Sequence, residues 1–444
     1  MRNIIYLLTF VLVMTNAPMV FSQQSELKLS LKDALQKAEE NNRQINKAKE
    51  KGKAAKAEYR QTNSVFLPNV NLSHTAITTN DPLAAFGFKL KQEITTQVDF
   101  NPVLLNDPDR IENYNTKIEV QQPIINIDGL YGRKAANAKM QAVDYTTERT
   151  INFTRFEVKK AYYQLELAYE AVNVVEKSLE TAKSALQLTK DNLEQGYVKE
   201  ADLLSAKVRV LELKNQLADA NNAQKQAGEL LAYILGFDIR TEIVTTEKLD
   251  QKPSLLQAIN KGQDEGIRSD IMAYKKSLDA RENMLKSEKM RFIPRLNAFG
   301  AYEWNDSQLL GTSANNYLIG ASLSWDIFKG YKNVGRVQKA RAELKIAELD
   351  LADYQSKSSM EIQAAKRNLK IAFDRIEISK LAKDQAEEAY RIRTNRYKQG
   401  LEKTTDVLQS ESMAMMKNLD YINSLYQYHV AVFHLELLLE KELQ

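Results

Sequence analysis

The chain has 444 residues, 43% of them hydrophobic and 27% charged, which predicts a folded protein with a substantial core. The formal net charge of +4 has both signs interspersed, so there is no basic block that would neutralise phosphates, and we expect no nucleic acid partner. Cysteine is absent, which excludes disulfides, thiol nucleophiles and thiolate metal sites. Only 15 glycines and 8 prolines interrupt long Ala-, Leu-, Glu- and Lys-rich stretches, so most of the chain is expected to be helical.

Residues 1–22 have the pattern of a secretory signal peptide. Arg2 precedes an apolar run from Ile4 to Met14, and Ser22 is a small residue at the expected cleavage point. No later segment has the roughly 18 consecutive apolar residues that a transmembrane helix requires. We therefore expect an exported chain that enters a membrane, if it does so at all, as strands.

The remainder of the chain is a duplication. Gly196 and Asp202 recur as Gly400 and Asp406, at an offset of 204 residues. The sequence Phe-Leu-Pro ending at Pro68 recurs as Phe-Ile-Pro ending at Pro294, at an offset of 226. The change of offset predicts two structural repeats, at 23–235 and 254–444, a linker at 236–253, and an insertion in the first repeat at about 78–114.

Each repeat is predicted to contribute two short strands. After Pro294, and again from Tyr317, apolar and polar residues alternate over about ten positions, and the first repeat has weaker counterparts around Leu72 and Val120. Such strands suit either a small soluble sheet or a lipid-facing barrel. Four strands are too few to close a barrel, so in a membrane several chains would have to share one.

Long helices occupy the rest of each repeat. No proline interrupts 129–197, and the apolar spacing of three and four residues from Val158 to Leu193 is typical of coiled coils. The second repeat follows the same pattern at about 334–397, and return helices are expected at about 203–235 and 407–439. Shorter helices open on the capping residues Ser30 and Ser254.

These features together resemble the TolC-like outer-membrane efflux family, over the chain from about Leu29 to Leu439. The similarity rests on the signal peptide, the paired Leu-Ser-Leu-x-x-Ala and Ser-Leu-Leu-x-Ala openings, the two Phe-x-Pro sequences, and the Tyr-x-x-Gly-x(5)-Asp-Val-Leu segment from Tyr397 to Leu408. The resemblance implies a mostly α protein with a small β part. It implies a trimeric outer-membrane β-barrel with four strands per chain, continued by a long α-helical coiled-coil barrel in the periplasm.

The resemblance also implies the function and the partners. A homotrimer of this family is a passive conduit in a tripartite efflux or type I secretion system, held in outer-membrane lipid. A periplasmic adaptor protein couples it to an inner-membrane pump such as an RND or ABC transporter. The alternative is an exported coiled-coil scaffold protein, which explains the helices but not the paired helix-to-strand transitions.

The resemblance places the pore entrance at the two helical turns. Gly196 and Gly400 would form hairpin tips that contact the adaptor, and Asp202 and Asp406 would form rings of three carboxylates, with helix capping as the alternative role. Tyr397 would bond to Asp202 or else fill the helical seam.

Two residues depart from the family pattern at this entrance. Glu402 stands where a basic residue is expected, and Gln409 stands where a second acidic residue is expected. We therefore expect a different closing contact, for instance between Glu402 and Lys199 or Lys403.

Nothing in the sequence predicts an enzyme, a cofactor or a metal site. His74 falls in a predicted strand, and His429 and His434 are five residues apart on one predicted helix, so they do not share a face. The insertion is rich in Asn-Pro and Asp-Pro steps, which predicts an extracellular loop in which residues 86–90 could extend a strand.

Overall fold

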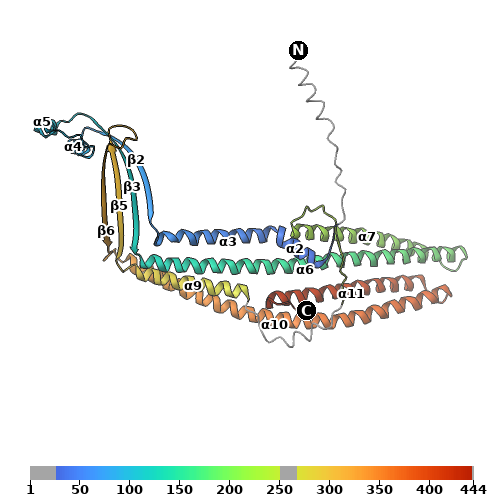
Figure 1. Ribbon diagram of the computed structural model, residues 1–444. Coiled ribbons are helices and arrows are strands. Elements are labelled where there is room, and N and C mark those ends of the chain that lie inside the picture. The colour runs from blue at the N-terminus through green and yellow to red at the C-terminus, as the bar shows by residue number, and fades with distance from the viewer. Residues whose placement is uncertain (1–26, 251–267, 443–444) are drawn as a thin grey trace, which may run out of the picture. The chain divides into compact units, whose positions relative to one another are not determined.

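The computed structural model describes residues 27–250 and 268–442, coloured in Figure 1. The predicted signal peptide and the predicted cap at Ser254 lie outside these residues. The described chain forms two units, one from residues 27–46, 151–250 and 362–442, and the other from residues 47–150 and 268–361. The long helices α6 (Ile127–Glu194) and α10 (Lys332–Lys398) contribute to both units.

The first unit contains two helical hairpins. One joins α6 to α7 (Glu200–Leu235), and the other joins α10 to α11 (Thr404–Leu439). α6 has 68 residues and α10 has 67, so each helix is about 100 Å long at 1.5 Å per residue. The hairpins begin and end close to where the duplication predicts, because the turn glycines are local signals.

The apolar seam of α6 forms the core of this unit. Tyr162, Leu165 and Val158 are almost completely buried, and they pack with Leu231 of α7 and Leu369 of α10 in one cluster. A second cluster nearer the turns joins Leu179 and Leu213 to residues of α11. The predicted three- and four-residue spacing therefore does bury one face of each helix.

A two-stranded parallel sheet lies against α6 in the first unit. β1 (Leu27–Leu29) precedes the short helix α2 (Leu31–Asn41), whose N-cap is Ser30, as predicted. Its partner β4 (Ile243–Thr245) falls in the segment predicted as a linker. The buried Tyr162 hydroxyl donates to the Leu29 carbonyl at 2.9 Å and accepts from the Thr246 amide at 3.0 Å, which fixes both strands to the helix.

The second unit is built on a four-stranded antiparallel sheet in the order β2-β3-β5-β6. The strands are β2 (Asn69–Thr79), β3 (Ile111–Ile125), β5 (Arg295–Asp306) and β6 (Ala314–Ser324). Pro68 and Pro294 immediately precede β2 and β5, as expected of a residue without an amide donor. The two outer strands, β2 and β6, each leave one edge without a partner strand among the described residues.

Helices lead to and from this sheet in the second unit. α3 (Arg43–Gln61) reaches β2 through the short helix η1 (Thr62–Val65), and α9 (Ser269–Met290) leads to β5 (Figure 1). Asp128, in the first turn of α6, is buried and accepts from the guanidinium of Arg295, at 3.0 Å for the Nε atom. Among the helices of residues 27–250 and 268–442, none is long and apolar enough to cross a membrane.

The insertion in the first repeat contains three short helices, so the expected strand extension at 86–90 is wrong. It contains α4 (Pro82–Lys91), the short helix η2 (Gln97–Phe100) and α5 (Pro102–Asn106). Asp81 accepts from the Ala84 amide at 2.8 Å and caps α4, whose first residue is Pro82. The Asp81-Pro82 step, which predicts a turn, is therefore a helix start in the structure.

Candidate pore entrance at the helical hairpin tips

The two hairpin turns of the first unit have the same backbone geometry. Gly196 has φ +76° and Gly400 has φ +74°, in the left-handed region that glycine adopts most readily. In the first turn the Tyr197 amide donates to the Asn192 carbonyl at 2.8 Å and the Gly196 amide donates to Leu193 at 2.9 Å. The second turn repeats both bonds 204 residues later. This pattern closes a helix C-terminus and reverses the chain.

Asp202 and Asp406 each lie in the first turn of the returning helix. The Asp202 carboxylate accepts from the Lys199 amide at 3.0 Å, so it caps α7. The Asp406 amide donates to the Lys403 carbonyl at 3.2 Å, as the Asp202 amide does to the Lys199 carbonyl at 2.9 Å. Capping, the alternative role for these residues, is therefore confirmed for Asp202, and capping leaves one of its carboxylate oxygens for other partners.

Tyr397 lies in the seam between the two hairpins. Its side chain is buried, and its hydroxyl lies 3.1 Å from the Thr189 hydroxyl of α6 and 3.1 Å from the Thr404 hydroxyl of α11. Both threonines are buried as well. The expected bond to Asp202 is thus not the one the tyrosine makes in this structure. The hydroxyl joins three helices instead, and this bond sits within the predicted apolar seam.

Glu402 pairs with arginines and not with the expected lysines. Its carboxylate lies 3.1 Å from Arg396 Nε and 3.7 Å from Arg393 Nη1, and both arginines are in the last turns of α10. The left-handed Gly400 folds the chain back over the end of its own helix, so Glu402 reaches side chains one turn apart there. The contact expected with Lys199 or Lys403 is thus not the one that Glu402 makes within this chain.

A buried ion pair joins the hairpins below the tips, and the sequence reading did not find it. Arg209 of α7 donates from Nε to Glu411 Oε2 of α11 at 2.7 Å, and the two side chains are only 8% and 5% exposed. The second carboxylate oxygen of Glu411 is buried and has no hydrogen-bond partner. Each residue occupies an apolar seam position, since Arg209 lies three residues after Ala206 and Glu411 four residues after Val407. A charged residue at a position where the helical pattern calls for an apolar one is the sequence signal that could have identified this pair.

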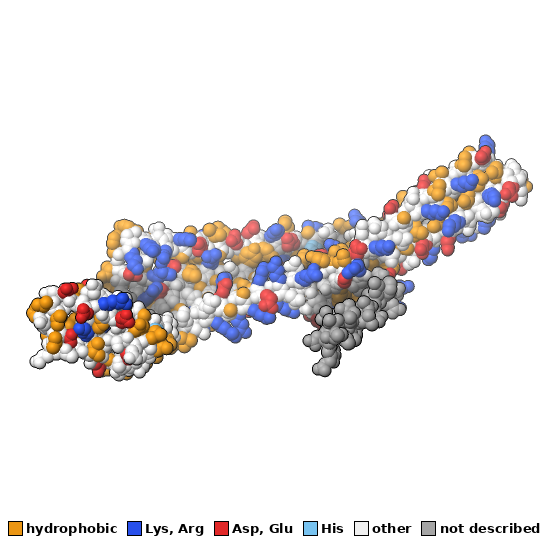
Figure 2. All heavy atoms as spheres, turned by 90° about the horizontal axis from the view of Figure 1, so that it is seen from above, with side chains coloured by type: hydrophobic (Ala, Val, Ile, Leu, Met, Phe, Trp, Pro, Cys, Tyr) orange, Lys and Arg blue, Asp and Glu red, His pale blue; other side chains and the backbone are white. Residues whose placement is uncertain are grey.

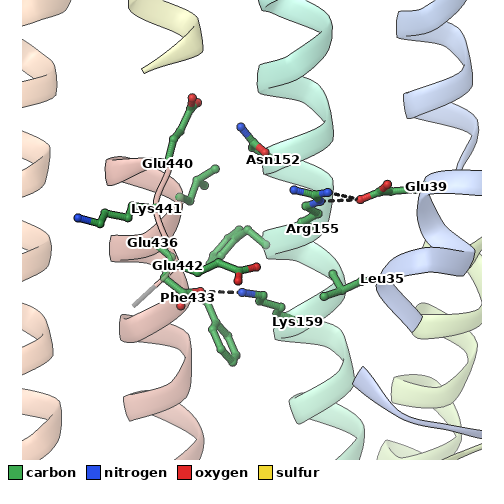
Figure 3. A pocket seen from close by; sticks show the side chains of 12 residues that line it. Leu35, Glu39, Asn152, Arg155, Lys159, Phe433, Glu436, Glu440, Lys441 and Glu442 are labelled. Carbon is green, nitrogen blue, oxygen red and sulfur yellow. Dashed lines mark hydrogen bonds and ion pairs between the residues drawn. The ribbon is translucent and has the colours of Figure 1, made fainter. Parts of the chain in front are cut away.

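One hollow in the first unit is lined mainly by charged side chains. It has a volume of about 210 Å³ and lies between α2, α6 and α11 (Figure 3). Those charges pair across it, Arg155 with Glu39 and Lys159 with Glu436, the latter pair at 2.7 Å. Within residues 27–250 and 268–442, no group of His, Asp and Glu side chains could hold a metal ion.

The fold is that of bacterial outer-membrane channels. It matches a membrane protein from Pseudomonas aeruginosa with a TM-score of 0.76 at 17% identity, over 92% of both chains. It matches the Campylobacter jejuni CmeC outer membrane channel at 0.76 and 16%, over 92% of this chain and 85% of that one. The outer membrane protein VceC from Vibrio cholerae gives 0.76 and 17%, over 93% of this chain and 97% of that one.

The chain belongs to the outer membrane efflux protein family, whose model matches residues 34–237 and 266–440. No curated protein matches the chain. The protein is therefore an efflux channel component of the cell outer membrane, extending into the periplasm, and the exported scaffold alternative is not favoured. Members of this family are passive channels rather than enzymes, and they work with adaptor and inner-membrane pump partners.

Proposed function

We propose that three copies of this chain join edge to edge into one closed, twelve-stranded sheet in the outer membrane. The observation that carries the proposal is the pair of open edges on the four-stranded sheet. β2 and β6 run in opposite directions, so β6 of one copy can pair antiparallel with β2 of the next. Such a head-to-tail contact forms a closed ring when a whole number of copies completes one full turn, here three copies each rotated by one third of a turn.

The two faces of the sheet support this arrangement. One face carries large, exposed apolar side chains, with Leu72 at 68% and Ile319 at 77% exposure. The other face carries polar and charged side chains, among them Lys117, which lies opposite Glu303 across β3 and β5. An apolar face toward lipid and a polar face toward a water-filled lumen is the division that a membrane-embedded sheet needs.

We further propose that the hairpin tips form the periplasmic entrance. Asp202 and Asp406 would each make a ring of three carboxylates, which favours cations over anions. Gly196 and Gly400 would form the turns that the adaptor contacts. Tyr397 and Glu402 would stabilise the closed entrance through their contacts within each copy. An inner-membrane pump of the RND or ABC type would drive drugs, metal ions or polypeptides through the conduit, and susceptibility of a deletion strain to each class would identify the substrate.

Native mass spectrometry of the detergent-extracted protein tests the shared sheet. We expect the mass of three chains for the natural protein. Leu72→Arg puts a charge on the apolar face and should abolish membrane assembly, because an arginine facing lipid costs about 2–4 kcal/mol at mid-membrane. Its neighbour Ser73 faces the opposite side, so Ser73→Arg should still give trimers. Monomers of the natural protein, or equal loss in both variants, would contradict the proposal.

A further inference from the structure

The helical insertion is anchored to the end of the four-stranded sheet. Gln92, which follows α4 and is buried, donates to the Asn113 side chain at 2.9 Å and to the Glu112 carbonyl at 2.8 Å. Asn113 in turn donates to Asn305 of β5 at 3.2 Å. This buried polar network ties the insertion to two strands at once, so the insertion has a fixed place on the sheet.

The anchor lies on the polar face. Asn113 and Asn115 are two residues apart on β3 and therefore share a face, which is also the face of Asn305 and Glu303. Lys91, the last residue of α4, reaches Glu303 at 3.3 Å on that same face. In the closed sheet proposed above, this face surrounds the lumen. The insertion thus approaches the channel mouth from the inside.

The insertion also holds its own helices together. Lys89 of α4 pairs with Asp99 of η2 at 2.7 Å, and Phe86 meets Phe100 edge to face at 5.4 Å between ring centres. These contacts connect α4 to η2 directly. The insertion is therefore a folded structure that can carry a surface, and not a freely moving loop.

Apolar side chains cover much of that surface and have no partner within the described chain that buries them. Orange side chains are visible at the end of Figure 2 that holds the strands, α4 and α5. Val103 and Leu83 are 73% and 84% exposed. The other exposed large apolar residues of the insertion are Leu90, Ile94, Val98, Phe100 and Leu104. Seven such residues in one short segment would be costly in water, so they are expected to be covered in the assembly.

The dimensions allow three insertions to meet. Twelve strands spaced about 4.8 Å apart and tilted by about 40° enclose a circle roughly 24 Å across. A helix as long as α4, ten residues, extends about 15 Å, which exceeds the radius of that circle. Three helices of about 10 Å diameter therefore fill most of the mouth.

We propose that the insertions of three copies pack their apolar surfaces against one another and form a hydrophobic constriction at the extracellular mouth of the channel. The inference rests on the trimer proposed above. An apolar constriction resists the passage of ions because water leaves it readily. The channel would then have a second closure, distinct from the one at the hairpin tips, which substrate must push apart.

Cysteine crosslinking tests the contact between copies, because the natural chain has no cysteine. Val103→Cys should form disulfide-linked pairs of chains in mild oxidant. Tyr317→Cys is the matched control, since this side chain is equally exposed at 74% but lies on the apolar face of β6, away from the lumen. It should give no linked pairs.

Single-channel conductance in planar bilayers tests the constriction itself. Replacing residues 82–106 with a short Gly-Ser linker should raise conductance roughly twofold or more. Val98→Ser combined with Val103→Ser keeps the fold and should raise it in the same direction. Unchanged conductance in both variants, with no Val103→Cys crosslink in a protein that is still trimeric, would overturn the constriction and leave the conduit standing. A monomeric protein would overturn both.

Discussion

The two helical hairpins share one backbone design but are stabilised differently. α6 of the first hairpin carries the small parallel sheet, through the Tyr162 hydroxyl and through a hydrogen bond from the Thr245 hydroxyl to Glu166. At the positions 204 residues later, α10 has Lys366 and Lys370, and Lys370 is exposed. The second hairpin has buried and ion-paired side chains at its tip instead, around Tyr397 and Glu402.

This difference indicates that, in a duplicated chain, one helical hairpin can be held in place by extra contacts while the other is left freer to move. The first hairpin is attached to a sheet that includes the segment between the repeats. The second hairpin packs on the first through two apolar clusters, the Arg209–Glu411 pair and the Tyr397 hydroxyl, and it has no sheet of its own among the described residues. We therefore expect motion at the entrance to be easier in the second hairpin, which no sheet holds.

The buried ion pair gives the largest expected effect. Arg209→Met leaves Glu411 buried without a cation and should cost about 3–5 kcal/mol of unfolding free energy, measured by urea denaturation. The double variant Arg209→Met with Glu411→Met should recover most of that loss, because it removes both charges. Equal losses of unfolding free energy in the single and double variants would show that packing, and not charge, matters at this position.

Variants of the two turn glycines test whether the backbones of the two tips are equally strained. Gly196→Ala and Gly400→Ala should each cost about 1–2 kcal/mol, since both residues have left-handed φ values and L residues other than Asn and Asp resist them. Open space surrounds both positions, so no clash adds to the cost. Thermal denaturation should give the same shift for both. A much larger shift at Gly400 would place extra strain in the second tip.

Tyrosine variants test whether the tips differ in side-chain contacts. Tyr397→Phe removes a buried hydroxyl that contacts Thr189 and Thr404, and should cost about 1 kcal/mol. Tyr197→Phe at the first tip is the matched control, because Tyr197 is 76% exposed and should be neutral. Hydrogen exchange of the tip amides should quicken only in Tyr397→Phe. Equal exchange in both variants would argue against a closing role for Tyr397.

Features set by neighbouring residues could be predicted from the sequence, and contacts between distant segments could not. Pro68, Gly196 and Gly400 mark boundaries because proline and glycine restrict or free the local backbone. The pairing of β1 with β4, and of Arg209 with Glu411, joins segments about 200 residues apart. A single sequence does not show which residues of two such distant segments lie opposite each other. The insertion was misjudged for a different reason: the Asp81-Pro82 step suits a turn and a helix start equally, and the residues that follow decide between them.

The smallest expected effect lies on the first hairpin alone. Burial raises the pKa of Glu166, although the hydrogen bond from Thr245 opposes this. A carboxyl whose folded pKa lies above its unfolded pKa contributes stability at low pH, and this contribution is lost as pH rises through the folded value. Glu166→Gln keeps an acceptor for Thr245 but carries no charge, so it should be more stable than the natural protein at pH 8 and equal to it below pH 4. Glu377→Gln, at an exposed position of α10, is the control and should change little at any pH. If both variants respond alike, the pH dependence belongs to the surface charge of the helices, and the sheet-bound first hairpin has no electrostatic feature that the second lacks.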